Sequence, residues 1–369
     1  MTSLPSTLLD AFLSIARSDG IDRNIVECGN ESWTYGDLDA ISTGLALELH
    51  QKYGPKPVVA VMSENENHPY VLAILFATWK LGGIFAPLNT IFSRDITERR
   101  LHVIAPTCVL VPFIEPVIQD ILKGDLPPPS IFFLVADKVF LDLSIPCLPF
   151  NPADTTITAL SQRYLNQAPE LSTSLFPVPA PEDIALYLQT SSPSTASNVK
   201  SVPISHKNFT TGAQAAIFWF KKTWPQQDFN HLRILGWTPW CYTIGMSHDI
   251  GATLLTAGCY IFSTIPSGYP TGVDAAKNSS HYLSAHTQLL DTAISKKTTS
   301  FAGPPMILEG FMEMWKNELE RARIMEAAKL FKVFGSGGAP TSTECIEWAK
   351  EAGLPLVLAF GMTELAGML

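Results

Sequence analysis

Apolar residues in the first third of the chain alternate between helical spacing and short unbroken runs. In some segments they recur every three or four positions, as on one face of a helix, and in others they form the continuous stretch typical of a buried strand. The pattern predicts helices over residues 38–53, 68–81 and 96–104, and strands over residues 58–62, 84–88 and 108–111. Strands and helices that alternate at this rhythm predict parallel strands joined by crossover helices.

A second series of the same kind follows later in the chain. It predicts strands over residues 184–188, 232–237, 260–262, 331–334 and 356–360, and helices over residues 209–220, 250–255, 306–329 and 342–352. Between the two series, residues 125–181 are rich in proline, which disfavours regular helix. We therefore predict an α/β fold of two βαβ-type sub-domains with mostly parallel sheets packed together, the first over residues 1–180 with a proline-rich excursion at 125–181, the second over residues 181–369.

The composition narrows the class of protein. Apolar residues make up 46% of the chain and charged residues 16%, a balance that excludes disorder for most of its length. The net charge is −9, and the chain lacks the clustered basic residues that binding to nucleic acid requires. The longest apolar run, residues 71–79, is too short to span a membrane. Six cysteines without a C-x-x-C pair are typical of reduced, mostly buried thiols, so we expect a cytoplasmic protein.

Three loops carry residues suited to chemistry, and each directly follows a predicted strand. Residues 190–200 are rich in Ser and Thr and close with Lys200, a set that can bind phosphate oxygens. Residues 335–340 hold three glycines, which permit close approach of a flat ligand. Residues 360–364 combine an aromatic ring, a hydroxyl and a carboxylate. In a parallel sheet, ligands bind at the carboxyl ends of the strands, so the position of these loops is informative as well.

Each loop also has an ordinary structural interpretation. The first could be a flexible serine-rich surface loop, which composition alone favours. The second could be a strand-to-helix turn with Thr341 or Ser342 as the helix N-cap, and the third a strand end that enters a loop.

Taken together, the three loops resemble the adenylate-forming superfamily of acyl-CoA synthetases, nonribosomal-peptide adenylation domains and luciferases. That family has a Thr-Ser-Gly-(Ser/Thr)-Thr-Gly-x-Pro-Lys-Gly phosphate loop, a Gly-Gly-Ala-Pro segment and a Tyr-Gly-Met-Thr-Glu motif, in this order. Further segments are similar to other family elements, namely residues 33–38, 80–89 and 301–306. The resemblance runs from about Trp33 to the last residue. Within the superfamily, the sequence is most similar in character to fungal synthetase-like and carboxylate-reductase adenylation domains.

The resemblance implies a two-step reaction. A carboxylate attacks the α-phosphorus of ATP to give acyl-AMP and pyrophosphate, and a thiol, of CoA or of a carrier protein, or another acceptor then takes the acyl group. The implied cofactors are ATP or AMP and Mg²⁺, and the implied partner is a small carboxylic acid.

The family's functional positions carry over residue by residue. Thr190, Ser191, Ser194, Thr195 and Lys200 fall on the phosphate loop, and Gly337, Gly338 and Ala339 fall on the adenine-side segment. Phe360, followed by Gly361, replaces the family's stacking tyrosine; Thr363 would contact the α-phosphate and Glu364 would coordinate Mg²⁺. Residues 239–245 match the family's Pro-x-x-His-x-x-Gly segment, which implies a substrate pocket at Trp240, Tyr242 and Gly245.

Three departures from the family pattern bear on activity. Ser192 and Ala196 stand at or near glycines of the phosphate loop, where a β-carbon can distort the phosphate cradle. Tyr242 stands at the position of the family's histidine. The sequence stops shortly after Glu364, before the family's ribose-binding aspartate and its mobile C-terminal domain with a catalytic lysine. We therefore expect the C-terminal lid domain to be absent and residues 365–369, which have no following element to pack on, to be poorly ordered.

Two function classes remain open. The leading hypothesis is a carboxylate–AMP ligase that is incomplete or weakly active. The alternative is a non-catalytic nucleotide-binding, acyl-binding or interaction protein that keeps the pocket without the reaction. A third reading, a different α/β nucleotide-binding enzyme, is less well supported by the loops. Amino-acid activators of the family hold the ammonium with an Asp in the first pocket segment, and residues 240–245 contain none, although Asp249 lies nearby.

Overall fold

A computed structural model describes residues 5–63, 69–89, 94–110, 176, 178–190, 200–263 and 280–368. By their contacts, the residues group into two compact units. The first comprises Met1–Arg23, Trp33–Phe209 and Pro239–Tyr242, and the second Asn24–Ser32, Thr210–Thr238 and Thr243–Leu369. Most of the predicted proline-rich excursion at 125–181, namely residues 125–175 and 177, lies outside the described residues.

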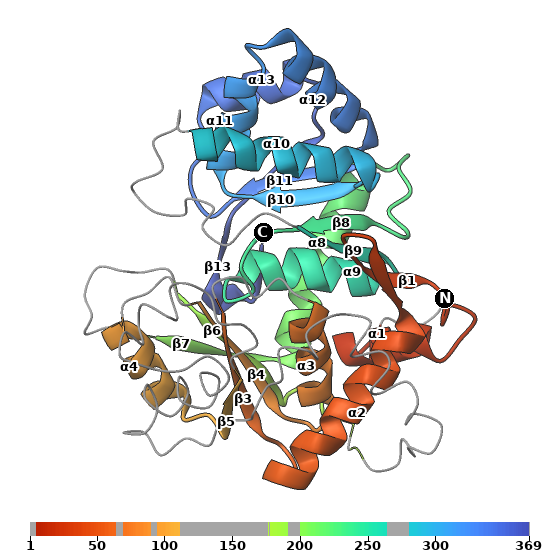
Figure 1. Ribbon diagram of the computed structural model, residues 1–369, viewed down its shortest axis with the longest axis vertical. Coiled ribbons are helices and arrows are strands. Elements are labelled where there is room, and N and C mark those ends of the chain that lie inside the picture. Colours follow the sequence, from red (N-terminus) through yellow and green to blue (C-terminus); the bar gives the residue numbers. More distant parts are fainter. Residues whose placement is uncertain are drawn as a thin grey trace. The chain divides into compact units, whose positions relative to one another are not determined.

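The first unit is built on a five-stranded sheet in the order β5-β3-β4-β6-β7 (Figure 1). Its strands are β3 (Val58–Ser63), β4 (Ile84–Asn89), β5 (Cys108–Leu110), β6 (Ile184–Gln189) and β7 (Ser201–Ser205). Its helices are α1 (Leu8–Ala16), α2 (Tyr35–Tyr53), α3 (Pro69–Lys80) and α4 (Arg94–Ile104). Strands β3 to β6 are parallel and β7 runs antiparallel to β6, so the sheet is mostly parallel, as predicted.

A buried lysine joins two helices of this unit. Lys80, at the end of α3, is only 4% exposed, and its Nζ donates to the Asp39 carboxylate (2.5 Å), Ser42 Oγ (2.8 Å) and Thr43 Oγ1 (2.7 Å) of α2. Burial lowers the pKa of Lys80 to about 8, and the Asp39 carboxylate opposes that shift. The hydrogen bonds replace the water that the ammonium loses, which makes its burial tolerable.

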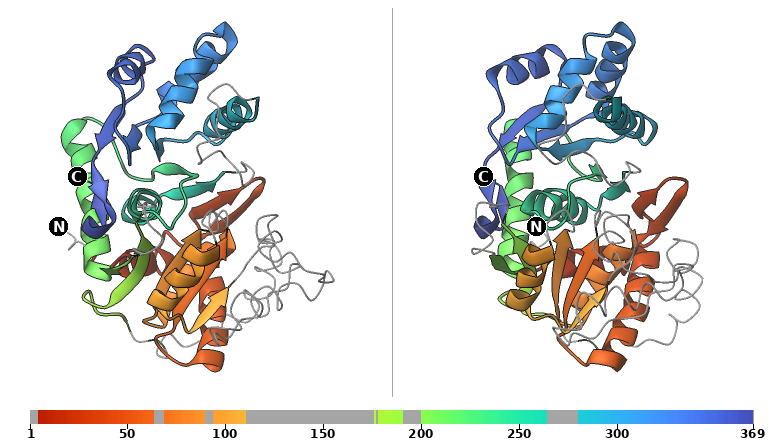
Figure 2. Two further views of the ribbon diagram at one scale, coloured as in Figure 1. Left: turned by 90° about the vertical axis from the view of Figure 1, so that its left-hand side faces the viewer. Right: turned by 60° about the vertical axis from the view of Figure 1, so that its left-hand side comes forward.

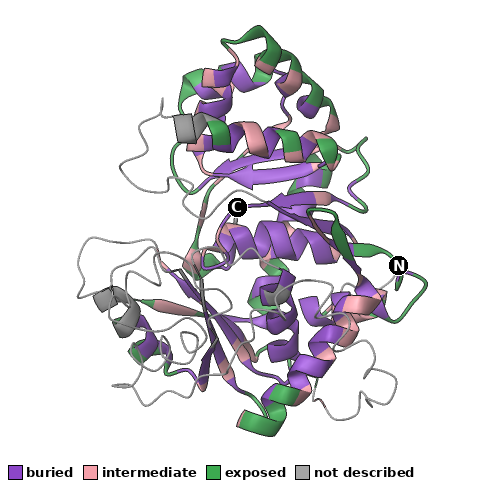
Figure 3. Ribbon diagram, viewed as in Figure 1, coloured by how far each residue is buried: buried purple, intermediate pink, exposed green. Residues whose placement is uncertain are grey.

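The second unit is built on a seven-stranded sheet in the order β12-β11-β10-β8-β9-β1-β2. Its strands are β1 (Asn24–Cys28), β2 (Glu31–Thr34), β8 (Arg233–Gly236), β9 (Cys259–Phe262), β10 (Ser300–Gly303), β11 (Val333–Gly337) and β12 (Leu356–Ala359). The strand pairs β1–β9, β9–β8, β8–β10, β10–β11 and β11–β12 are all parallel. Every residue of β9, β10 and β11 is buried, as expected for a parallel sheet covered on both faces (Figure 3).

Helices cover both faces of the second sheet (Figure 2). On one face α10 (Ser280–Ser295), α11 (Pro305–Met314), α12 (Glu318–Leu330) and α13 (Thr343–Glu351) pack around Phe301 and Phe334. On the other face, α8 (His206–Thr223) and α9 (Ala252–Leu255) pack against Ile234 and Val333.

Several sequence predictions need correction. The segment 184–188, predicted to open the second series, is β6 and pairs with β4 in the first sheet, while β1, from the N-terminal part of the chain, pairs with β9 in the second. The apolar pattern of a strand does not specify which strand it pairs with. The sequence therefore did not predict that β6 belongs to the first sheet or β1 to the second. The predicted domain boundary near residue 180 itself stays a prediction.

The predicted long helix over residues 306–329 is two helices. The chain leaves α11 at Trp315, and α12 begins after Asn317, whose side chain accepts hydrogen bonds from the Leu319 and Glu320 amides. Asparagine at an N-cap satisfies amides that a continuous helix would have bonded internally, so it favours this break.

The described cysteines are reduced and mostly inaccessible. Cys108, Cys241, Cys259 and Cys345 are buried and Cys28 is half-buried, in agreement with the predicted free thiols, while Cys147 lies outside the described residues. Burial raises the pKa of Cys259 to about 12, with a further contribution from the nearby Glu27 carboxylate.

In the core of the second unit, a neighbouring side chain leaves no space for anything larger than glycine at position 310. A β-carbon at Gly310 in α11 would lie 1.9 Å from Nε2 of His286, which is fully buried on α10 and meets the Phe311 ring edge-on. Gly→Ala inside a helix ordinarily stabilises by about 1 kcal/mol. We expect Gly310→Ala to reverse that sign and destabilise by about 1–3 kcal/mol, because the ring has no room to move.

Chemical denaturation of Gly310→Ala, His286→Ala and the double variant measures this effect. The clash predicts that Gly310→Ala lowers the free energy of unfolding when the His286 ring is present. In the His286→Ala background, where the clash is gone, the same change should raise the free energy of unfolding, as the helix preference of alanine predicts. A stabilised Gly310→Ala single variant would contradict the packing described here.

Candidate functional site

The glycine-rich turn after β11 is required by two different constraints. Gly337 pairs with Ala359 of β12, and a β-carbon there would lie 2.7 Å from the Ala359 carbonyl oxygen. Gly338 has a φ of +80°, a backbone conformation that residues other than glycine rarely adopt. Gly338 and Ala339 are exposed, so the turn presents bare backbone at the carboxyl end of β11.

The turn leads into α13 by a standard helix start. Ser342 is the N-cap, and its Oγ accepts a hydrogen bond of 3.2 Å from the Cys345 amide, so Ser342 rather than Thr341 has the predicted capping role. Thr341 instead lies with its Oγ1 2.9 Å from Ser336 Oγ. The turn therefore starts helix α13 and also lies next to the end of β12.

The predicted aromatic, hydroxyl and carboxylate positions follow β12 directly. Phe360 is 71% exposed, and Thr363 and Glu364 form a short 3-10 turn between β13 (Gly361–Met362) and β14 (Gly367–Met368). The Glu364 carboxylate is exposed, as a metal ligand or a solvated side chain would be. The second unit therefore brings Gly337 and Phe360 to neighbouring strand ends.

The prediction of poor order at residues 365–369 is wrong for the part that the structure describes. Strand β14 pairs antiparallel with β13, with Gly361 opposite Met368 and Met362 opposite Gly367. A β-carbon at Gly367 would lie 2.8 Å from the Cα of Gly212 in α8, so two glycines permit the hairpin to pack closely on that helix. Leu369 lies outside the described residues.

A π-helix stands where the sequence predicted only a short α-helix at 250–255. It spans Ile244–Gly251 and continues into α9, and it carries Gly245, the one predicted substrate-pocket residue that belongs to the second unit. The wider turn of a π-helix is uncommon and recurs at functional sites. All of its residues from Gly245 to Gly251 are buried.

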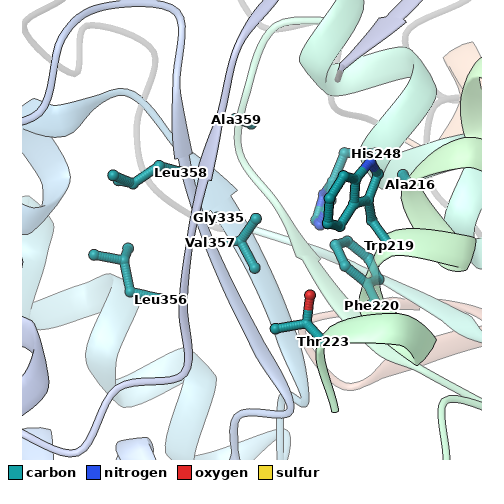
Figure 4. Close-up of a pocket in the computed structure, with 10 residues that line it drawn as sticks. All are labelled: Ala216, Trp219, Phe220, Thr223, His248, Gly335, Leu356, Val357, Leu358 and Ala359. Carbon is teal, nitrogen blue, oxygen red and sulfur yellow. The ribbon is translucent and has the colours of Figure 1, made fainter. Parts of the chain in front are cut away.

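The π-helix contributes His248 to a cavity of about 230 Å³ within the second unit (Figure 4). Strand β12 lines the cavity with its whole length, β11 contributes Gly335, and α8 contributes mostly apolar side chains. The lining residues are Ala216, Trp219, Phe220, Thr223, His248, Gly335, Leu356, Val357, Leu358 and Ala359. Gly335 lies opposite Val357 in the β11–β12 pair, and a β-carbon at Gly335 would lie 3.0 Å from the Ala302 Cβ of β10. The cavity thus adjoins the two strands that end in the glycine-rich turn and in Phe360.

His248 is held by a buried polar network. Its Nδ1 lies 2.7 Å from Asp249 Oδ1, and its Nε2 lies 3.3 Å from Ser300 Oγ on β10. All three residues are at most 1% exposed, and Asp249 Oδ2 has no hydrogen-bond partner among the described residues. Burial raises the pKa of Asp249 to about 6, although the hydrogen bond with His248 acts in the opposite direction. An ionised Asp249 would accept from Nδ1–H and leave Nε2 to accept from the Ser300 hydroxyl.

The predicted site residues of the first unit lie at the end of β6 and in the segment 239–242. Thr190 is half-buried directly after β6, Lys200 is exposed directly before β7, and Trp240 is fully buried while Tyr242 is half-buried. The Gln189 amide donates to the Cys241 carbonyl at 3.2 Å, so the start of the predicted phosphate loop and the segment 239–242 are adjacent. Ser191, Ser194 and Thr195 lie outside the described residues.

Three polar residues in or beside these regions were not found from the sequence. They are His248 in the second unit, and Arg100 and Gln189 in the first; Asp249 was noted only as an aspartate near the predicted substrate pocket. A histidine and an aspartate inside an otherwise apolar helical stretch are the local signal that could have indicated the His248–Asp249 pair. Arg100 and Gln189 are 89 positions apart and carry no local signal.

Comparison with known proteins places the chain in a family. The AMP-binding enzyme family matches residues 14–369, and the chain therefore belongs to that family, as its motifs predicted. Hispidin synthase from Neonothopanus nambi is 36% identical over 376 residues, which cover 99% of this chain and 21% of the relative. The chain thus spans about a fifth of the length of that curated protein.

Solved structures with low sequence identity share the fold. VinN in complex with L-aspartate superposes with a TM-score of 0.70 at 14% identity, covering 98% of this chain and 77% of VinN. ATP-bound MatB from Rhodopseudomonas palustris gives 0.69 at 19% identity, covering 97% and 60% of the two chains. The predicted α/β fold with mostly parallel sheets is confirmed. Within the described residues, no helix is long and apolar enough to cross a membrane, and no three His, Cys, Asp or Glu side chains group as metal ligands.

The buried Asp249 predicts a specific dependence of stability on pH. Because its pKa is raised from the usual 3.8 to about 6, the folded protein binds this proton more tightly than the unfolded chain, and stability is lost as the pH rises through this window. Asp249→Asn lacks this loss. The free energy of unfolding of the variant relative to the wild type should therefore rise by up to about 3 kcal/mol between pH 4 and pH 7.

Urea denaturation of both proteins at each pH measures the difference directly and removes effects common to the two. The asparagine keeps an oxygen that can accept from His248, so the network is altered chiefly in charge. A difference between the two proteins that does not vary over this pH range would contradict a raised pKa at Asp249.

Proposed function

We propose that this chain binds ATP and a small carboxylic acid and forms the acyl-adenylate. The observation that carries the proposal is the mostly apolar cavity whose walls, β11 and β12, end in the glycine-rich turn and in Phe360. One pair of strands thereby offers an acyl-sized space and, at its carboxyl end, the residues expected to meet a nucleotide. Membership of the AMP-binding enzyme family and the fold shared with ATP-bound MatB support the same reaction.

The residues present fit a nucleotide and Mg²⁺. Gly338, whose absent side chain would face open space, leaves exposed backbone for an adenine ring, and the exposed Phe360 ring is free to stack on it. Glu364 would hold Mg²⁺ through its exposed carboxylate, the oxygen ligand that this ion prefers, and Thr363 and Lys200 would contact phosphate oxygens. When bound, Mg²⁺ supplies neutralisation of phosphate charge. The chain's own part is to hold the carboxylate and the α-phosphate in line and to exclude water from the apolar cavity.

The substrate we propose is an aryl or medium-length acid without an α-amino group. Asp249 is not among the residues that line the cavity, and its Oδ1 lies 2.7 Å from His248 Nδ1. The cavity is walled by valine, phenylalanine and tryptophan side chains, with Thr223 and His248 as the polar members, while the leucine side chains of β12 point away from it (Figure 4). Such a lining favours an apolar acyl group. The L-aspartate bound by VinN is a property of that protein and is not carried over to this chain.

The proposal also covers the acceptor of the acyl group and the rate of turnover. A CoA or carrier-protein thiol would take the acyl group, as the family resemblance implies. We expect slow turnover, because Ser192 and Ala196 occupy positions at or near glycines of the family's phosphate loop. The alternative, a protein that binds nucleotide and acid without reaction, is distinguished by experiment.

Carboxylate-dependent exchange of labelled pyrophosphate into ATP tests the reaction. We expect exchange with at least one aryl or medium-length acid and a loss of 10-fold or more in Lys200→Ala and in Glu364→Ala. The matched control is Lys221→Ala, which removes a solvent-facing lysine from α8 outside the cavity lining. Binding of AMP or of an acyl-AMP analogue without any exchange would favour the non-catalytic alternative.

A cavity-filling variant tests where the acid binds. Val357→Phe enlarges a side chain that lines the cavity, so the KM for the acid should rise 10-fold or more while the KM for ATP changes less than twofold. Leu319→Phe makes a similar addition at a 77% exposed position of α12 and serves as the control. Equal effects of Val357→Phe on both KM values would contradict an acyl site in this cavity.

A further inference from the structure

The cavity of the second unit has one ionisable side chain among the described residues that line it. That side chain is His248 of the π-helix, and the other lining residues are uncharged. A carboxylate that enters a mostly apolar space loses its hydration, so it needs a cation or hydrogen-bond donors there. Of the described residues that line the cavity, His248 is the one that can carry a positive charge.

His248 lies toward one end of the cavity. In Figure 4 it lies nearer the Ala359 end of β12, whereas Thr223 lies nearer the Leu356 end. At the usual rise of a strand, these two ends of β12 are about 10 Å apart. Phe360 directly follows Ala359, so the His248 end is the one next to the exposed ring expected to meet the nucleotide.

The hairpin that follows β12 borders the π-helix as well. Strand β14 contacts the π-helix, and the turn between β13 and β14 carries Thr363 and Glu364. Under the proposed function these two residues meet the α-phosphate and Mg²⁺. An acid whose carboxylate lies beside His248 would therefore have its reactive end toward the bound nucleotide and its tail toward Thr223.

Asp249 makes the His248 ring suited to binding an anion. Its Oδ1 lies 2.7 Å from His248 Nδ1, and its Oδ2 has no hydrogen-bond partner among the described residues. Burial raises the pKa of Asp249 to about 6, so the carboxylate is ionised at pH 7 although it is fully enclosed. A buried negative charge favours a counter-charge beside it, which the ring supplies when it takes a second proton.

The other ring nitrogen has a replaceable contact. His248 Nε2 lies 3.3 Å from Ser300 Oγ, which is longer than the roughly 2.9 Å of an ordinary hydrogen bond between nitrogen and oxygen. In the doubly protonated ring Nδ1–H donates to Asp249, and Nε2–H is available to a second acceptor. A carboxylate at Nε2 would thus replace a long contact with a charge-assisted hydrogen bond.

We propose that His248 is a substrate-binding residue whose ring, charged against Asp249, pairs with the carboxylate of the acid at the end of the cavity next to Phe360. The proton on the ring comes from the undissociated acid or from solvent. This inference rests on the proposed function, because that function places an acid in the cavity. A charged His248 favours an acid over the corresponding amide, whereas a ring that only packs treats the two alike, since their shapes match.

The test compares two acids with their uncharged amides. The probes are 3-phenylpropionate with 3-phenylpropanamide, and octanoate with octanamide. Calorimetry at pH 7 measures the Kd of each probe for the wild type, His248→Gln, Asp249→Asn and Thr223→Val. Glutamine keeps a hydrogen-bonding nitrogen without the charge. Thr223→Val is the matched control, because it removes the hydroxyl at the other end of the same cavity with little change of shape.

We expect the wild type to bind each acid at least 10-fold more tightly than its amide. His248→Gln should reduce this preference to less than twofold by weakening the acid alone, and Asp249→Asn should give an intermediate preference. Thr223→Val should change the Kd of acid and amide by the same factor. A wild type without preference for the acid, or a wild-type preference in His248→Gln, would overturn the proposal. Should His248→Gln fail to fold, an unchanged preference in Asp249→Asn would overturn it.

The two proposals fail separately. A chain that shows no exchange of pyrophosphate into ATP, but prefers acids through His248, would refute the proposed function and support the carboxylate site. Exchange that persists in His248→Gln with an unchanged KM for the acid would refute the role of His248 and leave the proposed function intact. A wild-type protein that binds none of the four probes would refute the acid site in this cavity, on which both depend.

Discussion

Burying a charged side chain removes its hydration, and both units of this protein meet that cost with hydrogen bonds to particular oxygens and nitrogens. Lys80 is bonded by the α2 oxygens, Arg100 by oxygens at the end of β6, and Asp249 by the His248 ring. Each compensation constrains geometry, because a buried charge loses several kcal/mol if a partner moves away. The constraint at Lys80 joins two helices, whereas those at Arg100 and Asp249 hold polar groups beside regions assigned to ligands.

The second unit combines this constraint with missing side chains. Gly335, Gly337 and Gly212 each remove a β-carbon at a place where another element approaches or a cavity opens. The π-helix places His248 in the lining of the cavity beside β12 (Figure 4). The cavity therefore results from small residues on the sheet and an irregular helix opposite it, with an apolar lining supplied largely by α8 and β12.

The sequence predicted the family, the fold class and most strands and helices, because these depend on local patterns. Gly337 and Gly338 were also predictable, since only glycine suits a close strand contact or a positive φ. Strand partners were not predictable from local pattern, as the placement of β1 and β6 shows. The polar networks were missed for the same reason: His248 meets Ser300 from 52 positions away, and Arg100 meets Gln189 from 89.

The buried thiols give each unit its own built-in reporter. Cys108 and Cys241 belong to the first unit and Cys259 and Cys345 to the second, and all four are sealed from solvent in the folded chain. A thiol-specific reagent can modify them only when the surrounding structure opens, so its rate at each position measures local unfolding. Labelling followed by peptide mass analysis would therefore separate the opening of one unit from that of the other without any engineered probe.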